Sequence, residues 1–479
     1  MAGGVAVWPL LGLLALLAAC ARSEPPPASC PPEDAVGAVY YVSPQGDDQG
    51  SGSREDPWRT PGLATRRLQP GDTLVILPGR YVLKTYPGDI LTVPPGEEGR
   101  WVTICGPTEE PAPVLMGQDN LRAAINLSGA RYARIYHLEI THNPDAEKVA
   151  FRDGILALDR PIEHVVLRDL YIHHLDQFGI DLRDAYDLVI EDSRIEYCGF
   201  GAIGSAAGKE GGLRQLVVRH SRLSYSGHYY QGGDGSDRPY DRPDGFGVEA
   251  SQGPVWIEGV VAEHNRGDGL DSKVAETIIR NSIVANNWGD GVKLWGERGV
   301  LENVLIYGRG DGDPRTSPWA ALVVHTPEEG ARFELRHVTL DDALGQNYLI
   351  HVQYDDPDVP VELVLRNVIF SARGDRSALY LAPGVRLDAA GVMFAYRDPA
   401  DLLRWRGESY GCDRIGELGE RVFCGEPDFL RPAWGEEGDY HLGPRSQAID
   451  AGVAAGVAFD LDGRRRDKRP DLGAYEYRP

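Results

Sequence analysis

Short apolar segments recur along most of the chain, each reading apolar-x-apolar, one or two polar residues, and then apolar again. They run from ARIYHLEI at residues 133–140 to LVLRNVIF at residues 363–370. This alternation is typical of strands that bury one face. The steps between equivalent apolar positions range from 22 to 39 residues, and the longer steps fit a 22-residue unit that carries insertions. The equivalent positions are Ile135, Leu167, Ile190, Val218, Ile257, Ile279, Leu301, Leu335 and Leu365.

A repeat of this length, made of strands and turns without helical periodicity, predicts a solenoid. Leucine-rich repeats are excluded because no leucine-asparagine motif recurs, and a propeller blade needs about 40 residues. The interpretation that remains is an all-β, right-handed parallel β-helix over residues from about 75 to 395. An open solenoid end exposes strand edges and core, so we expect a capping helix near Gly62–Leu68.

Within the repeat, the triplet Gly-Asp-Gly occurs at residues 267–269 and again at 289–291. Aligning the coils on this frame places Phe246, Leu270 and Val292 in one inward column. Gly247, Asp271 and Lys293 then form the next column, which points outward. Adjacent parallel strands are about 4.8 Å apart, so we expect Asp271 and Lys293 side by side. Asp244, Asp268 and Asp290 form a further column at the turn that enters each strand.

Carboxylates this close repel one another and raise each other's pKa. A hard cation with oxygen ligands, such as calcium, relieves the repulsion. A cation next to an amine suits proton abstraction from C5 of a 4-linked uronate, because the cation stabilises the charge that develops beside the carboxylate. The amine of Lys293 would be the base, with activity rising toward alkaline pH.

Charge narrows the choice of partners. The 479-residue chain carries 49 basic and 72 acidic residues, a formal net charge of −23. Nucleic acid is not expected, because a phosphate binder needs a basic face. An acidic polysaccharide would be held only if cations bridge it to the protein. We expect a monomer.

The N-terminus has the features of an export signal. Residues 8–20 read WPLLGLLALLAAC, an apolar run too short to span a bilayer. The end of this run resembles the bacterial lipobox. The resemblance implies a signal peptide at residues 1–19 and lipidation of Cys20, which would anchor the protein to a membrane of the cell envelope. A plain secretory signal is the alternative. Residues 20–37 are Pro-rich and are interpreted as a tether.

An exported chain can form disulfides. Cys412 and Cys424 bracket a short loop and are the expected pair, and Cys30 with Cys105 is a further possibility. Cys198 lies in an apolar strand, where a buried thiol is the more common state.

Both ends of the repeat region resemble known proteins. Residues 40–82, with YYVSPQGDD and a Pro-Gly-Asp turn, resemble the opening of exported β-helix proteins of the pectate-lyase-like superfamily. Residues 446–477, which end in DLGAYEY, resemble the C-terminal module common on such proteins. The resemblance implies a capped β-helix over residues 38–395 and a small C-terminal module over residues 396–479.

The central motifs PDGFGVE, NRGDGLD and GDGVKLWG resemble three successive motifs of polysaccharide lyase family nine. That family cleaves pectate by β-elimination with calcium. The resemblance implies that Asp244, Asp268 and Asp271 are calcium ligands and that Lys293 is the catalytic base. The pattern departs at Gly267, which stands where the family has a further ligand aspartate.

Other residues and functions stay open. Arg266 and Arg298 flank the motifs and could bind substrate carboxylates. The long loop at residues 226–245 could form a rim with tyrosines that stack on sugars. Lys273, which could pair with Glu249, is the competing base. The first alternative function is a non-catalytic surface protein that binds glycan, with structural aspartates. It is favoured if Lys293 is buried under a loop and disfavoured if Lys293 lies on an open groove. The second is a polysaccharide hydrolase or epimerase, for which Asp244 and Asp268 could act as paired carboxylates.

Overall fold

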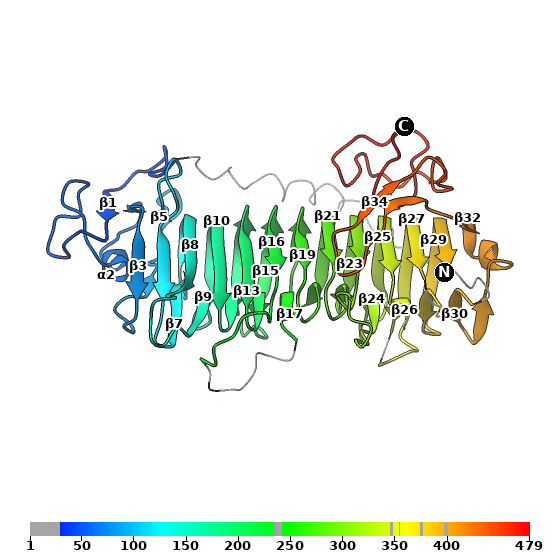
Figure 1. The fold of residues 1–479 in the computed structure, drawn as a ribbon, viewed down its shortest axis with the longest axis horizontal. Coiled ribbons are helices and arrows are strands. Elements are labelled where there is room, and N and C mark those ends of the chain that lie inside the picture. Colours follow the sequence, from blue (N-terminus) through cyan, green and yellow to red (C-terminus); the bar gives the residue numbers. More distant parts are fainter. Residues whose placement is uncertain are drawn as a thin grey trace, which may run out of the picture.

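The computed structural model describes residues 29–233, 235, 242–344, 348–353, 355–373, 377–396 and 401–479. In this part the chain forms a right-handed parallel β-helix whose coils stack along one axis (Figure 1). The signal peptide and Cys20, predicted at residues 1–20, lie outside the described residues. No helix in the described part is long and apolar enough to cross a membrane.

The described coils contribute to two long parallel sheets. The larger sheet, sheet A, contains β1 (Val39–Val42), β2 (Thr73–Ile76), β3 (Arg80–Leu83), β5 (Val102–Cys105), β6 (Val114–Gly117), β8 (Arg131–His142), β10 (Ile162–Leu175), β12 (Ala185–Glu191), β13 (Arg194–Cys198), β15 (Leu213–Arg219), β16 (Arg222–Ser224), β18 (Val255–Glu258), β19 (Val261–Glu263), β21 (Glu276–Ala285), β23 (Arg298–Tyr307), β25 (Ala331–Asp342), β27 (Val361–Ala372), β29 (Val385–Tyr396) and β32 (Gly419–Cys424).

The second sheet, sheet B, carries the candidate site. It contains β4 (Leu91–Thr92), β7 (Leu121–Asn126), β9 (Phe151–Ala157), β11 (Phe178–Leu182), β14 (Gly201–Ser205), β17 (Asp244–Ser251), β20 (Leu270–Val274), β22 (Val292–Leu294), β24 (Ala320–Val324), β26 (Tyr348–Val352), β28 (Leu379–Leu381), β30 (Leu403–Trp405) and β31 (Glu408–Tyr410). Its strands pair in parallel from β4 to β30, and only β31 pairs antiparallel.

The repeat predicted from the sequence is confirmed residue by residue. Ile135 pairs with Leu167, which pairs with Ile190, and the pairing continues through the remaining six positions to Leu365. All nine side chains are at most 1% exposed, so they form one column of the core. The insertions that lengthen some steps are therefore turns and loops that leave the stacking intact.

Sheet A bends along a second column of residues. Asn281, Asn303, His337 and Asn367 stack on successive coils with φ between 49° and 59°. This left-handed conformation is uncommon for residues with a Cβ, and Asn and His adopt it more readily than most. Asn303 Nδ2 donates to Asn281 Oδ1 over 3.0 Å, so the side chains also link one coil to the next.

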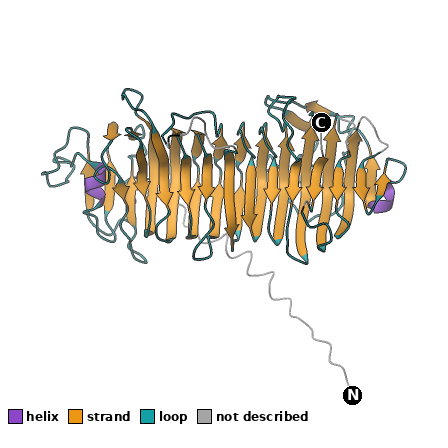
Figure 2. Ribbon diagram, turned by 90° about the horizontal axis from the view of Figure 1, so that it is seen from below, coloured by secondary structure: helices purple, strands orange, loops and turns teal. Residues whose placement is uncertain are grey.

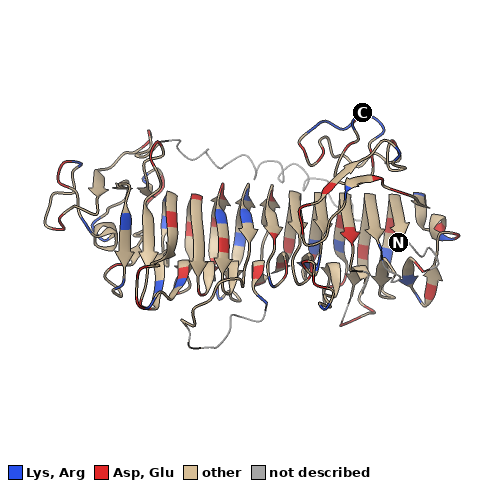
Figure 3. Cartoon of the chain, viewed as in Figure 1, with Lys and Arg blue, Asp and Glu red and all other residues tan. Residues whose placement is uncertain are grey.

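Charged side chains cover the outer face of sheet A. The column through Glu191 and Arg219 continues through Glu258, Arg280 and Glu302, so acids and bases alternate on consecutive coils (Figure 3). Opposite charges on neighbouring strands stabilise a sheet, and like charges directly opposite destabilise it. The alternation therefore limits repulsion between these coils of an acidic chain, although the column ends in two arginines in register, Arg336 and Arg366.

Both ends of the solenoid carry a short helix (Figure 2). At the first coil, α2 (Pro61–Thr65) packs beside β4 with Pro61 and Ala64 buried, close to the position predicted for a cap. At the other end, the 3-10 helix η1 (Ile415–Leu418) packs against β32, with Ile415 buried. These elements cover strand edges that would otherwise be open.

The boundary expected at residue 395 is wrong. β30 pairs in parallel with β28, and β32 pairs in parallel with β29, so the solenoid continues to Cys424. The structure joins Cys412 to Cys424 by a disulfide, which closes this last coil. The sequence missed the coil because the segment lacks a long apolar run.

The C-terminal module, residues 425–479, packs on sheet A near β21 to β29 (Figure 1). It contains the antiparallel pair β33 (Phe429–Arg431) and β34 (Asp439–Leu442). Asn367 exchanges two hydrogen bonds with the backbone of Val453, at 2.8 and 2.7 Å. Arg466 donates to Asn303 Oδ1 over 3.0 Å. The module therefore binds to the column of left-handed residues at the bend.

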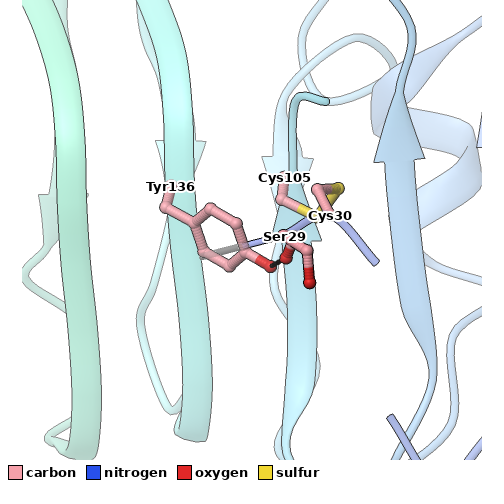
Figure 4. The surroundings of a disulfide bond; sticks show 4 residues. All are labelled: Ser29, Cys30, Cys105 and Tyr136. Carbon is pink, nitrogen blue, oxygen red and sulfur yellow. Dashed lines mark hydrogen bonds between the residues drawn. A yellow bond between two sulfur atoms is a disulfide. The ribbon is translucent and has the colours of Figure 1, made fainter. Parts of the chain in front are cut away.

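The interpretation of residues 20–37 as a free tether needs correction for its second half. Cys30 forms a disulfide with Cys105, and Tyr136 donates a hydrogen bond to the Ser29 carbonyl over 2.9 Å (Figure 4). Arg134 binds Asp34 through two hydrogen bonds of 2.9 and 2.7 Å. From Ser29 onward the segment is fixed to the solenoid. Cys198 is free and buried.

Candidate functional site

The site lies on sheet B, where β17, β20 and β22 carry the three motifs. The register places Phe246, Leu270 and Val292 in one inward column. Asp271 pairs with Lys293 on the next coil and with Gly247 on the preceding coil, so these three residues form the outward column. The frame deduced from the Gly-Asp-Gly repeat is therefore the frame of the structure.

The repeated aspartates form a ladder between coils. Asp244 Oδ1 accepts the backbone N–H of Asp268 over 2.7 Å, and Asp268 Oδ1 accepts that of Asp290, also over 2.7 Å. Asp290 Oδ1 continues the ladder to the N–H of Ala320 over 3.0 Å. One oxygen of each carboxylate is thus committed to the fold. Only the second oxygens are available for other chemistry.

The glycines of the repeat allow this close stacking. A Cβ at Gly245 would lie 2.6 Å from the carbonyl oxygen of Gly269, and a Cβ at Gly269 would lie 2.7 Å from that of Gly291. A Cβ at Gly267 would overlap Asp244 Oδ1, and one at Gly289 would overlap Asp268 Oδ1. The Gly-Asp-Gly frame recurs because the aspartate ladder leaves no room for side chains on either side.

Asp244, Asp268 and Asp271 come together as one acidic cluster. Each offers a carboxylate oxygen, and these three oxygens all lie within 4.8 Å of one another. It is the one such group of metal-binding side chains within the described ranges. Asp271 Oδ1 is buried without a hydrogen-bond partner.

Burial, together with the crowding of carboxylates, raises the pKa values of Asp244, Asp271 and Asp290. Burial and the neighbouring Asp268 and Asp271 raise the pKa of Asp244 well above its usual range. Burial, followed by the charge of Asp268, raises the pKa of Asp271 to about 6. The same two causes raise the pKa of Asp290 to about 6. The cluster is therefore under electrostatic stress that a cation would relieve.

Lys293 is positioned by the same ladder but is not on an open groove. Its side chain is 4% exposed, and Nζ lies 2.5 Å from Asp268 Oδ2 and 3.3 Å from Asp290 Oδ2. Burial lowers the pKa of this amine, but the charges of Asp268, Asp290 and Asp271 outweigh it and raise the pKa above the usual value. The ring of Trp319 lies 5.4 Å from Nζ. Contrary to expectation, Lys293 is an enclosed ammonium.

A cleft of about 260 Å³ opens beside the cluster. One end of the cleft is lined by Arg242, Asp244, Glu249, Asp271 and Lys273. Lys273 is paired with Glu249 at 2.5 Å, and its side chain is 28% exposed. Lys293 is not among the residues that line the cleft. The lysine that faces the cleft is thus the competitor named from the sequence.

The two arginines proposed for substrate binding lie elsewhere. Arg298 begins β23 in sheet A and forms an ion pair with Glu276 at 2.8 Å, so its position contradicts the prediction. Arg266 is exposed and does not line the cleft. Arg242 occupies that place instead. It could have been noticed because it stands directly before the Pro-Asp-Gly motif.

The long loop at residues 226–245 is only partly within the described residues, since 234 and 236–241 fall outside them. Tyr229 stacks on His142, with ring centroids 5.1 Å apart, and Tyr230 stacks on Phe200 at 6.4 Å. Both tyrosine rings are therefore packed against aromatic side chains of the protein itself. His264 pairs with Asp311 at 2.8 Å and stacks on Tyr225.

A further aspartate of the ladder was missed. Asp153 Oδ1 accepts the N–H of Phe178 over 3.0 Å, the same bond that Asp244 makes to the next coil. Burial and the charge of Asp181 raise its pKa to about 8. The sequence Arg152-Asp153-Gly154 repeats the Asp-Gly signal, but its long distance from the other copies hid the match.

Solved structures of the same fold include pectate lyase Pel9A, which is 15% identical with a TM-score of 0.53. The match covers 92% of this chain and 97% of that chain. XylC in complex with xylose is 10% identical, with a TM-score of 0.51 and coverage of 91% and 98%. No family model matches the sequence. No curated protein matches it either. These similarities establish the class of protein, a right-handed parallel β-helix.

Proposed function

We propose that the protein is a calcium-dependent polysaccharide lyase that cleaves a uronate-containing, pectate-like polysaccharide by β-elimination. The observation that carries the proposal is the cluster of three carboxylates beside a cleft, in which Asp271 is in register with Lys293 on the next coil. The resemblance of the motifs to polysaccharide lyase family nine and the fold shared with pectate lyase Pel9A support it.

The residues present fit a calcium ion. Calcium takes carboxylate oxygens in flexible geometry, and Asp244, Asp268 and Asp271 supply them. Asp271 Oδ1, buried and without a hydrogen bond, is the atom that such an ion would satisfy. When bound, the ion would neutralise the carboxylate of a uronate and stabilise the negative charge that develops next to it.

Gly267 supplies no carboxylate, and its carbonyl keeps one lone pair beside the hydrogen bond that it already makes. This carbonyl accepts the N–H of Gly289 over 2.8 Å, as part of the backbone stacking between coils. Three carboxylates therefore remain. We expect weaker binding than at a site with a fourth carboxylate, since fewer ligand charges lower calcium affinity.

Lys293 is the proposed base, and its surroundings determine the pH range in which it could act. A base must be neutral to accept a proton, whereas Asp268 and Asp290 hold this amine as an ammonium. Asp268 would be shared between the amine and a cation. Activity should therefore rise toward alkaline pH. Lys273, on the cleft itself, is the competing base.

One observation favours a second function, a non-catalytic β-helix that binds glycan at the cell surface. Lys293 is buried beneath Trp319, and every aspartate of the ladder has a structural hydrogen bond. A stabilising role of the whole cluster would explain both. In that case the cation would fasten the coils together, and the cleft would bind sugar without cleaving it.

The arrangement does not favour a hydrolase. Hydrolysis needs two carboxyl groups on opposite sides of the scissile bond, about 5–9.5 Å apart. Asp244 and Asp268 lie next to each other on adjacent coils and are joined by the 2.7 Å bond from the Asp268 N–H to Asp244 Oδ1. Both carboxylates form one wall of the site. A sugar would contact them from the same side.

The test is elimination itself. Purified protein is incubated with polygalacturonate, alginate and glycosaminoglycans at pH 7 to 10, with calcium or with a chelator, and the absorbance of the unsaturated product is followed. We expect product only with calcium. Lys293→Ala and Lys293→Arg should each lower the rate by about 10²–10⁴, since guanidinium stays protonated. Lys273→Ala should keep most activity.

If Lys273→Ala loses the activity and Lys293→Ala keeps it, Lys273 is the base. Binding of a polymer without product would support the glycan-binding function instead. Product formation that is independent of calcium would overturn the role given to the acidic cluster.

We also propose that the protein works outside the cytoplasm, attached to the cell envelope through a lipid on Cys20. The two disulfides in the described residues support an oxidising compartment. Cys20→Ala should move the protein from the membrane fraction to the medium. An unchanged membrane fraction would show that no lipid at this cysteine holds it.

A further inference from the structure

The cleft continues beyond the acidic cluster toward earlier coils. Its lining runs from Asp271 on β20 through Gly247 on β17 and Gly201 on β14 to Phe178 on β11. These residues lie on consecutive coils, so the distance spans three strand spacings, roughly 14 Å. Gly201 and Gly247 contribute no side chain to this section of the lining. The cleft is therefore long enough to hold more than the reacting sugar unit.

Phenylalanine rings form the far end. The Phe178 ring lies on the backbone of β14, where a Cβ at Gly201 would be 3.2 Å from the ring and one at Gly204 would overlap it. Phe200 meets Phe178 edge to face, with centroids 5.8 Å apart and an interplanar angle of 87°. Tyr230 stacks on Phe200, with centroids 6.4 Å apart. The rings of Phe178 and Phe200 are thus held in place by the protein and line the cleft while half-buried.

Charge is distributed unevenly along the cleft. In the part of the chain that the structure describes, the charged lining residues gather at the end of the acidic cluster, namely Arg242, Asp244, Glu249, Asp271 and Lys273. Among the described residues, the lining at the other end consists of Phe178, Phe200, Gly201, Ile203 and Ser205. None of these described lining residues carries a charge that could meet a carboxylate.

We propose that the Phe178–Phe200 end is a binding subsite for an uncharged sugar unit of the same chain whose uronate lies at the acidic cluster. The inference rests on the proposed function and narrows its substrate to a mixed polysaccharide that contains both uronate and neutral sugars. The apolar face of a sugar ring gains from contact with an aromatic ring. A carboxylate placed there would lose water without gaining a partner.

The test compares a uniform polyuronate, polygalacturonate, with two mixed polymers, a rhamnogalacturonan backbone and hyaluronan. The parent should favour at least one mixed polymer in kcat/KM. Phe178→Ala should raise KM for that polymer about tenfold with little change in kcat, because the lost contact is made equally before and during the reaction. Phe178→Tyr keeps the ring and should restore KM. Phe178→Arg should shift the preference toward polygalacturonate.

Phe459→Ala is the matched control. Its ring is 53% exposed in the C-terminal module, away from the cleft, and its loss should change no kinetic constant. The subsite is overturned if Phe178→Ala cleaves the mixed polymers like the parent, or if the parent prefers polygalacturonate. Calorimetric titration of the same polymers separates this outcome from failure of the proposed function. A parent without lyase activity that binds a mixed polymer about tenfold more tightly than Phe178→Ala supports the subsite alone, and equal binding overturns it.

Discussion

Lys293 is in register with Asp271 but forms its ion pairs with Asp268 and Asp290. The amine therefore turns along the column of ladder aspartates rather than toward its neighbour in the outward column. Asp271 is left with a buried oxygen that has no hydrogen-bond partner. In the acidic cluster, the charge of Asp268 is thus neutralised by Lys293, whereas the charge of Asp271 would be neutralised by a bound cation.

The first prediction concerns the stability that Lys293 provides. Lys293→Met removes the charge between two buried carboxylates, and breaking a buried ion pair costs about 3–5 kcal/mol. We expect the melting temperature to fall markedly in a chelator and less in calcium, because the ion supplies positive charge to Asp268. Equal losses in both conditions would show that calcium does not bind near Asp268. Thermal unfolding followed by circular dichroism measures both.

The second prediction concerns the ion. Calcium that binds only the folded chain stabilises it, by about 2.7 kcal/mol at a concentration 100 times Kd. Asp271→Asn should abolish the calcium-induced rise in melting temperature. Asp290→Asn is the control, because Asp290 lies outside the cluster and the amide oxygen can still accept the Ala320 N–H. If Asp271→Asn keeps the full rise, the ion binds at another site.

The third prediction concerns the ligand that this chain lacks. The resemblance to polysaccharide lyase family nine suggests that Gly267→Asp would complete the calcium site. The structure predicts the opposite, because a Cβ at this position overlaps Asp244 Oδ1 and disturbs the ladder. Gly267→Asp and Gly267→Ala should both lower the melting temperature in calcium. A Gly267→Asp variant that gains calcium affinity at an unchanged melting temperature would contradict the clash.

The fourth prediction concerns pH. Burial raises the pKa of Asp153 from 3.8 to about 8, so the folded chain binds a proton that the unfolded chain releases. Stability from this group is complete below about pH 4 and is lost as the pH rises to about 8. Asp153→Asn keeps the acceptor for the Phe178 N–H and removes the titration. The variant should match the parent near pH 4 and exceed it at pH 9.

The expected gain for Asp153→Asn at pH 9 is on the order of a few kcal/mol, since each pKa unit corresponds to about 1.4 kcal/mol. Denaturant unfolding at the two pH values measures it. A constant difference between variant and parent at both pH values would show that Asp153 does not titrate in this range.

The sequence by itself determined the coil and its register. Inward apolar positions must alternate with outward ones in a strand, and a shift of one residue would expose the whole set. Ile135, Leu167 and their equivalents therefore align in only one way, and aligning the Gly-Asp-Gly copies brings Asp271 next to Lys293. The ladder role of Asp153 was hidden because its copy of the motif is isolated. The last coil, closed by Cys412 and Cys424, was hidden because it lacks the apolar run.

Only the tertiary structure decided what each side chain does within its column. Register specifies which residues are neighbours, but not which of several nearby charges a long side chain reaches. Lys293 bonds to Asp268 because that carboxylate is buried with it, and Trp319 covers it from a loop with no sequence periodicity. Arg298 is four residues from Leu294 of the same coil, yet Leu294 lies in sheet B and Arg298 in sheet A. Turns rotate the chain between faces, and their geometry depends on the packing of the whole coil.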